Sequence, residues 1–423
     1  MNYNEIKENV IELLKIEKSF KMWIKSNKDF ILSPQQKKFG QINIIDFFDK
    51  KEPVLIDQEF VTNGFAEVMI LPVLMLDSNV VGAIHGFMTK SDLISSSLKN
   101  DVKEFINSLI LDKDHQIYKS MSFSNENVRF YDINPFFYVM ECLLKNSNPS
   151  NVIDCLKSII TLQMLDYKIF KESNGTIIRK DPILEKESFH KYGSFDIDII
   201  AEKQYKDFLS DKKSIQEYKY TVNYIYLLLL KIAQINIYEK DKTPLKKVNL
   251  VKEHFSNSIG AFSAREILIS IYYFNNNIGS FIPVQKDNID EIFKVIYNSA
   301  IDISLLRMTE FFLHLGKRDK INNLVYPVTI EKHLINIGNA NKFKSQYSIK
   351  ENKFFTVFES DMKMVEKSKD FVNLLDNSKY FNEETFLERF KKDILSPEYV
   401  EKEIKDIELS IYQYKCYIDN NKK

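Results

Sequence analysis

The apolar run EVMILPVLML (67–76) constrains the fold of this chain more than any other stretch. A short continuous apolar run with β-branched residues is typical of a strand that is buried on both faces. Pro72 interrupts the run, and proline is unfavourable inside a central strand, so we expect the strand proper to begin at the next residue. The run ends in Asp77, after which Ser78 or Asn79 can cap a helix formed by VVGAIHGFM. A buried strand followed at once by a helix predicts an α/β unit.

The scarcity of glycine and proline predicts a predominantly helical protein around that unit. The 423 residues include only ten of each, and so few chain breakers favour long helices over tight turns. The length also exceeds that of a usual single core, so we expect two lobes or one domain with large insertions. The hydrophobic fraction of 44% is sufficient to fill such cores.

Charge and hydropathy narrow the class of protein further. Lys plus Arg and Asp plus Glu each number 59, so the formal net charge is zero, which argues against a broad basic face for duplex nucleic acid. The most apolar run (224–238) is too short to span a bilayer and contains Lys231, and the N-terminal segment lacks the apolar centre of a signal peptide. We therefore expect no membrane association and a cytoplasmic location.

The cysteines form no CxxC pair and predict neither a disulfide framework nor a zinc site: Cys142, Cys155 and Cys416.

Four acidic residues stand in apolar surroundings. Asp77 and Glu331 each follow an apolar predicted strand at the start of a helix. Glu141 lies in the apolar helix NPFFYVMECLL, and Asp302 lies in NSAIDISLLRMTEF. Burying one unpaired carboxylate is costly, so several of them in apolar surroundings indicate a shared counter-charge.

A divalent cation is the counter-charge that suits such a group best. The cationic side chains considered as partners, Arg307 and Lys332, are too few for four acids. Mg²⁺ and Mn²⁺ prefer carboxylate and water oxygens as ligands. A metal ion held by carboxylates can activate water and stabilise attack on a phosphodiester. The acids therefore predict a site for Mg²⁺ or Mn²⁺.

The order of these motifs resembles that of PIN-like domain nucleases. In that family the first strand ends in an Asp within a D-[ST]-N-[VL] pattern, followed by a helix Glu, a later helix Asp and a T-x-D-K-x-L stretch. In this chain LMLDSNVV, the helix NPFFYVMECLL, AIDISLLRMTEF and VTIEKHL follow in the same order. The resemblance implies metal-binding and catalytic roles for four acids: Asp77, Glu141, Asp302 and Glu331. It implies supporting roles for three neighbours: Asn79, Thr329 and Lys332.

The resemblance also implies a small parallel-sheet core that other segments interrupt. It covers roughly 70–145 and 295–340, and about 160 residues separate Glu141 from Asp302, so a large insertion must lie between them. Glu331 stands where the family usually has Asp, which lengthens the reach of that side chain by one methylene. The expected division is an N-terminal helical extension (1–66), a first core part (67–146), a mostly helical insertion (147–290), a second core part (291–344) and a C-terminal extension (345–423).

The function implied is a metal-dependent nuclease, most simply a ribonuclease that acts on RNA or another single-stranded nucleic acid with water as the nucleophile. Family analogy extends this to a toxin or phage-defence role. Two alternatives stay open. One is a non-catalytic helical scaffold or protein-interaction subunit, and the other is a degenerate PIN-like protein that binds RNA without cutting it. Homo-oligomerisation also stays open.

Three further patterns predict local features rather than chemistry. His85 lies in the helix after Asp77, where we expect a half-buried structural histidine. GKRDK (316–320) is either a solvated loop or, with nearby lysines, a basic rim for a nucleic-acid backbone. Asn174-Gly175 within YKIFKESNGTIIRKD predicts the turn of a β-hairpin.

Overall fold

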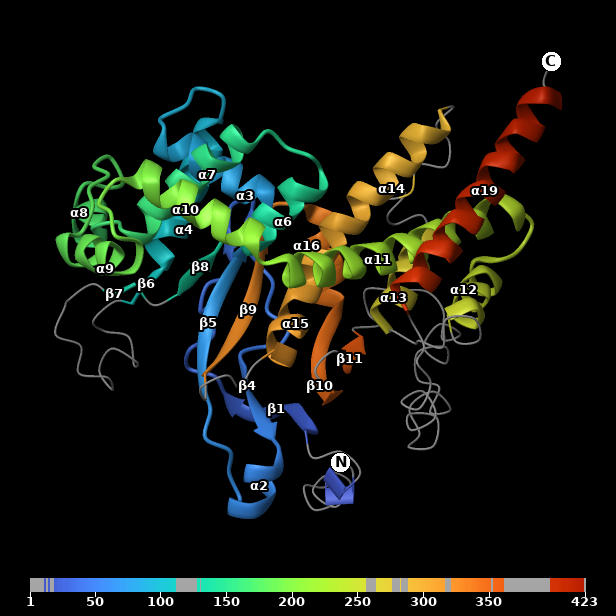
Figure 1. The fold of residues 1–423 in the computed structure, drawn as a ribbon, viewed down its shortest axis with the longest axis horizontal. Helices are drawn as coiled ribbons and strands as arrows, with labels where there is room; N and C mark the ends of the chain where they lie inside the picture. The colour runs from blue at the N-terminus through green and yellow to red at the C-terminus, as the bar shows by residue number, and fades with distance from the viewer. Residues whose placement is uncertain are drawn as a thin grey trace. The chain divides into compact units, whose positions relative to one another are not determined.

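The computed structural model describes residues 11–12, 14–15, 19–111, 128–129, 131–255, 264–275, 282, 288–315, 321–350, 353–360 and 396–421. The fold is mixed α/β with helix predominant, as expected (Figure 1). The chain divides into two units. The first unit comprises Met1–Ile215, Leu305–Asn339 and Phe343–Val357. The second comprises Gln216–Ser304, Ala340–Lys342 and Phe358–Lys423.

A five-stranded sheet in the order β2-β3-β9-β5-β8 forms the centre of the first unit. Strands β5 (Met69–Leu76) and β9 (Ile321–Thr329) pair in parallel along their whole length and lie side by side in Figure 1. β8 (Asp132–Asn134) pairs in parallel with the other edge of β5. The side chains of β9 are buried without interruption from Leu324 to Thr329, as expected of a parallel strand covered on both faces. The expected parallel pairing is therefore confirmed.

Two short antiparallel strands extend this sheet beyond β9. β2 (Lys38–Phe39) and β3 (Ile42–Ile44) form a hairpin, and β3 pairs with the end of β9. Gly40 begins the two-residue loop with a φ of +54°, a conformation that glycine adopts without strain. A β-carbon at this position would overlap the carboxylate of Asp101, which accepts a hydrogen bond from the Gln41 amide at 3.0 Å.

A second sheet of the order β11-β10-β1-β4 shows that the expected helical character of 1–66 is wrong for much of this segment. β1 (Lys21–Asp29) pairs antiparallel with β4 (Lys51–Ile56) and with β10 (Asn341–Lys350), which lies beside β11 (Lys353–Ser360). The buried Trp23 in β1 faces residues from the far end of the sequence, since its indole N–H donates to the carbonyl of Leu313 at 3.1 Å. These strands depend on partners about 300 residues away, which a local pattern does not reveal.

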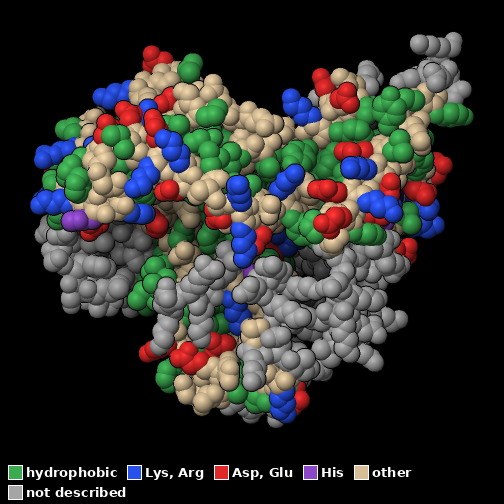
Figure 2. Space-filling view, viewed as in Figure 1, with side chains coloured by type: hydrophobic (Ala, Val, Ile, Leu, Met, Phe, Trp, Pro, Cys, Tyr) green, Lys and Arg blue, Asp and Glu red, His purple; other side chains and the backbone are tan. Residues whose placement is uncertain are grey.

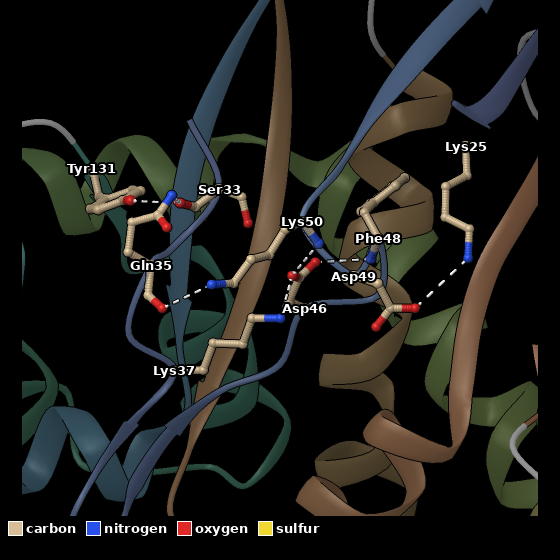
Figure 3. Close-up of polar contacts among 9 residues, drawn as sticks. All are labelled: Lys25, Ser33, Gln35, Lys37, Asp46, Phe48, Asp49, Lys50 and Tyr131. Carbon is tan, nitrogen blue, oxygen red and sulfur yellow. Dashed lines mark hydrogen bonds and ion pairs between the residues drawn. The ribbon is translucent and has the colours of Figure 1, made fainter. Parts of the chain in front are cut away.

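Asp46 organises the loop that joins the two sheets (Figure 3). Its buried carboxylate accepts hydrogen bonds from the amides of Phe48 and Lys50, both at 2.9 Å, and pairs with the Lys37 ammonium at 2.6 Å. Asp49 and Lys50 adopt positive φ angles of 52° and 62°, so the chain turns sharply before β4. The carboxylate satisfies the amides that this turn exposes, which gives Asp46 a structural role.

Helices surround the parallel strands of the first unit. α3, α4, α6 and α7 contact one another or the central sheet, and α15 packs on β9. The helices of this unit are α2 (Gln58–Asn63), α3 (Ser78–Met88), α4 (Ser96–Ser108), α6 (Phe136–Leu144), α7 (Pro149–Gln163), α8 (Tyr167–Glu172), α9 (Pro182–Tyr192), α10 (Ile197–Ser210), α15 (Met308–Leu315) and α16 (Lys332–Ala340), with a 3-10 turn at Leu305–Arg307 and a small two-stranded sheet of β6 (Ile110–Leu111) and β7 (Val128–Arg129).

Local expectations differ from the structure at three points. β5 begins at Met69, so Pro72 lies inside the strand, at a position where the described pairs of β5 are with β9 alone. The N-cap of α3 is Asp77, not Ser78 or Asn79. Asn174-Gly175 does form a turn with positive φ angles, but the short helix α8 precedes it in place of a strand, because the Asp166 side chain caps that helix at the Ile169 amide.

The described part of the second unit is mostly helical. The helix α11 (Lys212–Tyr238) enters it from the first unit and buries Tyr226–Leu230 consecutively, which confirms the expected core helix. The Tyr226 hydroxyl donates to Glu408 of α19 (Pro397–Asn421) at 2.6 Å. The remaining helices are α12 (Pro244–Glu253), α13 (Ala264–Phe274) and α14 (Ile289–Ser304). Among the described helices of either unit, none is both long and apolar enough to cross a membrane.

Candidate active site

Asp77 and Thr329 meet at one edge of the central sheet because β5 and β9 run in parallel. Leu76 is in register with Val328, and the amide of Asp77 donates to the Val328 carbonyl at 2.9 Å. The residues that follow the two strands are therefore neighbours, although about 250 positions separate them in sequence. The carboxyl ends of parallel strands are the usual position of sites in α/β proteins.

Asp77 occupies the N-cap position of α3, yet its carboxylate does not cap the helix. The side chain instead accepts a hydrogen bond from the Thr329 hydroxyl at 2.7 Å. Asp77 is 2% exposed and Thr329 is fully buried. An N-cap acid normally accepts from the first amides of its helix, so a carboxylate turned away from them indicates a different role.

Glu331 forms the exposed side of the same group. Its amide donates to the Thr329 hydroxyl oxygen at 3.0 Å, and its carboxylate accepts from the Asn79 side-chain amide at 2.9 Å. Thr329 therefore joins the backbone of Glu331 to the side chain of Asp77. The supporting roles of Asn79 and Thr329 in a metal site stay predictions, and Lys332 is exposed at the start of α16.

Glu141 reaches this edge from α6. The Asn134 side chain accepts the Phe136 amide at 2.8 Å where the helix begins, and the Phe137 amide contacts the Met75 sulfur of β5 at 3.4 Å. The Glu141 carboxylate accepts a hydrogen bond from the hydroxyl of Ser78, the residue after Asp77, at 2.8 Å. Thr329 thus links Asp77 with Glu331 through hydrogen bonds, and Glu141 is hydrogen-bonded to the residue that follows Asp77.

The two oxygens of the Glu141 carboxylate differ in their hydrogen-bond partners. Oε1 accepts from Ser78 and also forms an ion pair with the Lys145 ammonium at 2.6 Å. Oε2 is buried and has no hydrogen-bond partner among the described residues. Glu141 is 2% exposed, so this oxygen has lost water without gaining a protein donor.

The fourth acid, Asp302, belongs to a different unit of the chain from the other three acids. It is a half-buried residue of α14 and belongs to the second unit, whereas the other three belong to the first. Its participation in a common site stays a prediction. Within the described residues, no group of three or more His, Cys, Asp or Glu side chains is arranged to hold a metal ion.

Other reactive groups near these elements have structural explanations. His85 is half-buried and its Nδ1 lies 2.9 Å from the Ser158 hydroxyl, as expected of a structural histidine. Burial raises the pKa of the Cys142 thiol, and likewise that of Cys155. Both thiols are therefore protonated at neutral pH, which is unfavourable for a nucleophile.

Charged side chains do not gather into one basic face in the view of Figure 2, where lysines and arginines alternate with acids over the described surface. This distribution agrees with the zero formal net charge. The segment 316–320, for which the sequence leaves a solvated loop or a basic rim open, lies outside the described residues.

Ser78 and Lys145 were missed among the candidate residues. Lys145 follows Glu141 by four positions in ECLLK, the spacing at which a helix places a carboxylate beside an ammonium, so the sequence did contain its signal. Ser78 was assigned as a helix cap, and only the position of α6 reveals its contact with Glu141.

Comparisons with known proteins found no match: no protein-family model, no curated protein and no solved structure corresponds to this chain.

Proposed function

We propose that the chain is a metal-dependent nuclease that hydrolyses phosphodiester bonds in RNA or another single-stranded nucleic acid. The observation that carries the proposal is the Glu141 Oε2 atom, which is buried beside the Asp77 edge without a hydrogen-bond partner among the described residues. Leaving a buried acceptor unsatisfied costs about 1–3 kcal/mol. A divalent cation between Glu141 and Asp77 would supply the missing interaction and relieve the repulsion between the carboxylates.

Each proposed ligand is oriented by a neighbouring side chain. Thr329 holds Asp77, Ser78 holds one oxygen of Glu141, and Asn79 holds Glu331. Mg²⁺ or Mn²⁺, when bound, supplies activation of water and stabilisation of charge on the phosphate. The side chains themselves contribute the orientation that such a site requires.

The finer parts of the proposal rest on the resemblance to PIN-like domain nucleases. They are a PIN-like core interrupted by a helical insertion at 147–290, a fourth ligand from Asp302, a contribution from Lys332 and a toxin or phage-defence role in the cytoplasm. The parallel pair β5 and β9, with an acidic residue just beyond the end of each strand, supports the core.

The test is a Mn²⁺ titration of the full chain followed by thermal melting. A metal ion at 100 times its dissociation constant adds about 2.7 kcal/mol to the free energy of unfolding. We expect wild type to gain stability, Asp77→Asn and Glu141→Gln to lose that gain, and the control Glu202→Gln, an exposed acid of α10, to keep it. Single-stranded RNA should be cut by wild type with Mn²⁺ and not by Asp77→Asn. A wild-type protein that neither gains stability nor cuts RNA would refute the proposal.

Lys145 favours a second function. Its ammonium already neutralises one oxygen of Glu141, so the acids of the first unit are compatible with a site that holds no metal. The corresponding function is that of a degenerate PIN-like protein that binds RNA without cutting it. In this case RNA binding would persist in EDTA and no cleavage product would form with Mn²⁺. If the protein neither binds RNA nor responds to metal, the function that agrees with the results is that of a non-catalytic helical scaffold.

A further inference from the structure

A pocket of about 240 Å³ lies at the opposite end of α3 from the candidate active site. The 11 residues of α3 rise about 16 Å from the Asp77 end to the pocket. The walls come from the end of α3, the first turn of α4 and the turn that follows α8. Six residues line it: Phe87, Lys90, Lys99, Gly175, Thr176 and Ile178. The pocket is therefore separate from the carboxylates, and it carries two lysines and no acid in its lining.

Lys99 occupies an electrostatically unfavourable position. It lies in the first turn of α4, where the helix end carries partial positive charge that favours anions and disfavours cations. Its ion pair with Asp92 is long, at 4.0 Å, and the Asp92 side chain is fully exposed to water. Solvent screening leaves such a pair nearly without effect. The Ser95 side chain already caps the N-terminus of α4, so an anion in the pocket would act on the ammonium of Lys99.

Lys90 also has a conformation that its side chain does not favour. It follows the end of α3 with a φ of +54°, at a position that glycine usually occupies. Within the described part of the chain Lys90 has no ion-pair partner. Lys90 therefore places at the edge of the pocket an ammonium without an ion-pair partner among the described residues, which is an arrangement that favours an anionic group.

The other walls suit a flat ring. Phe87 is half-buried and its orientation is fixed by a T-shaped contact with Phe170, with ring centroids 6.2 Å apart. Ile178 adds a second apolar wall. Gly175 has a φ of +77°, and a β-carbon there would come within 2.9 Å of the Lys103 side chain and 3.2 Å of Phe170, so glycine leaves this wall of the pocket without a side chain.

We propose that this pocket binds one nucleotide, with the phosphate between Lys90 and Lys99 and the base against Phe87 and Ile178. The cavity of about 240 Å³ is smaller than typical ligand pockets, which measure about 300–1,000 Å³, so it suits a ligand no larger than a single nucleotide, either free or at the end of an oligonucleotide. Lysine pairs bind phosphate, and aromatic faces stack on bases of any identity. The site needs no metal ion and does not depend on the proposed nuclease function.

The test is calorimetric titration of the full, metal-free chain with a nucleoside 5′-monophosphate, the matching nucleoside and inorganic phosphate. We expect the monophosphate to bind at least tenfold more tightly than either fragment and to weaken with salt. Lys99→Met should reduce the affinity at least fivefold, and the control Lys206→Met, an exposed lysine of α10, should leave it unchanged.

The variant Lys90→Gly distinguishes a loss of nucleotide binding from a loss of folding stability. Glycine fits the left-handed conformation better than lysine, so the variant should melt no lower than wild type while it binds the nucleotide at least fivefold more weakly. Asp77→Asn changes the proposed metal site at the other end of α3 and should bind the nucleotide as wild type does. The nucleotide-binding proposal is therefore tested separately from the nuclease proposal.

The outcomes distinguish the sources of the nucleotide. Binding of the free monophosphate supports a small-ligand site, and binding of only a 5′-phosphorylated dinucleotide, weakened by Lys99→Met, supports a subsite for a strand end. Absence of binding by both at millimolar concentration would overturn the proposal, as would equal affinity in Lys99→Met. Tighter binding of phenyl phosphate than of any nucleotide would overturn the assignment of the ring to a nucleobase.

Discussion

Replacing Lys145 with methionine tests whether the Glu141 carboxylate is charged and requires a counter-ion. The side chain of Glu141 is 3% exposed and that of Lys145 is 30% exposed, so this ion pair lies between the surface and buried extremes. Exposed pairs contribute about 0.2–1 kcal/mol, and removing one partner of a buried pair costs about 3–5 kcal/mol. We therefore expect Lys145→Met to lower the free energy of unfolding by about 2 kcal/mol in the absence of metal.

The chain offers both a probe and a matched control for this measurement. Its single tryptophan, Trp23, is fully buried in the first unit, so urea unfolding followed by its fluorescence reports on the unit that contains Glu141. Glu202 and Lys206 have the same i, i+4 spacing on a helix but are 57% and 73% exposed. Lys206→Met should therefore change stability by less than about 0.5 kcal/mol.

A double substitution and a metal titration complete the test. Glu141→Gln removes the charge, so adding it to Lys145→Met should recover part of the lost stability. Mn²⁺ should recover part as well, because a divalent cation replaces the lost ammonium as the counter-charge. A loss in Lys145→Met no larger than that in Lys206→Met would refute the argument that Glu141 is a buried anion in need of a partner.

Three further predictions address other parts of the fold. Thr329→Val removes the hydroxyl that holds Asp77 and should cost about 1–3 kcal/mol in urea unfolding and weaken any Mn²⁺ response. Gly40→Ala forces a β-carbon to within 2.0 Å of a carboxylate oxygen of Asp101 and should lower the melting temperature, whereas Gly64→Ala, with open space around it, should have a smaller effect. Burial, with a smaller contribution from Lys231, lowers the pKa of His254 to about 4, below its ordinary 6.5. The unfolded chain therefore binds a proton between these values that the native chain does not, so stability falls as the pH drops from 6.5 toward 4, by about 2 kcal/mol after allowance for partial exposure. Circular dichroism at both pH values should show a smaller loss in His254→Gln.

The parts of the fold that the sequence predicted correctly depend on local patterns. The apolar run before Asp77 and the helix after it could be read from consecutive residues, and so could the strand and helix on either side of Glu331. A parallel pair then requires both acids to lie at one edge. Contacts between residues far apart in sequence could not be predicted from local patterns. β1 forms because it pairs with β10, and the contact of Ser78 with Glu141 follows from the position of α6.

Asp46 shows why an acid after an apolar stretch is an ambiguous signal. The segment INIIDFF has the same form as the stretch before Asp77, and Asp46 is equally buried, although it lies in the region for which the sequence predicts an N-terminal helical extension. Its carboxylate accepts two amides of the following turn, and the buried Asp57 accepts the Phe60 amide in the same manner. An acid in a loop or at a helix start can be satisfied by nearby backbone donors, and its burial then needs no ligand.

Glu141 cannot be satisfied in this way. It lies in the middle of α6, where the backbone amides already donate within the helix, so its carboxylate depends on side chains or on a bound ion. The side chains present, Ser78 and Lys145, both serve Oε1 and leave Oε2 without a partner among the described residues. The position within the helix, rather than burial alone, therefore distinguishes Glu141 from Asp46 and makes it the acid whose substitution tests the proposed site most directly.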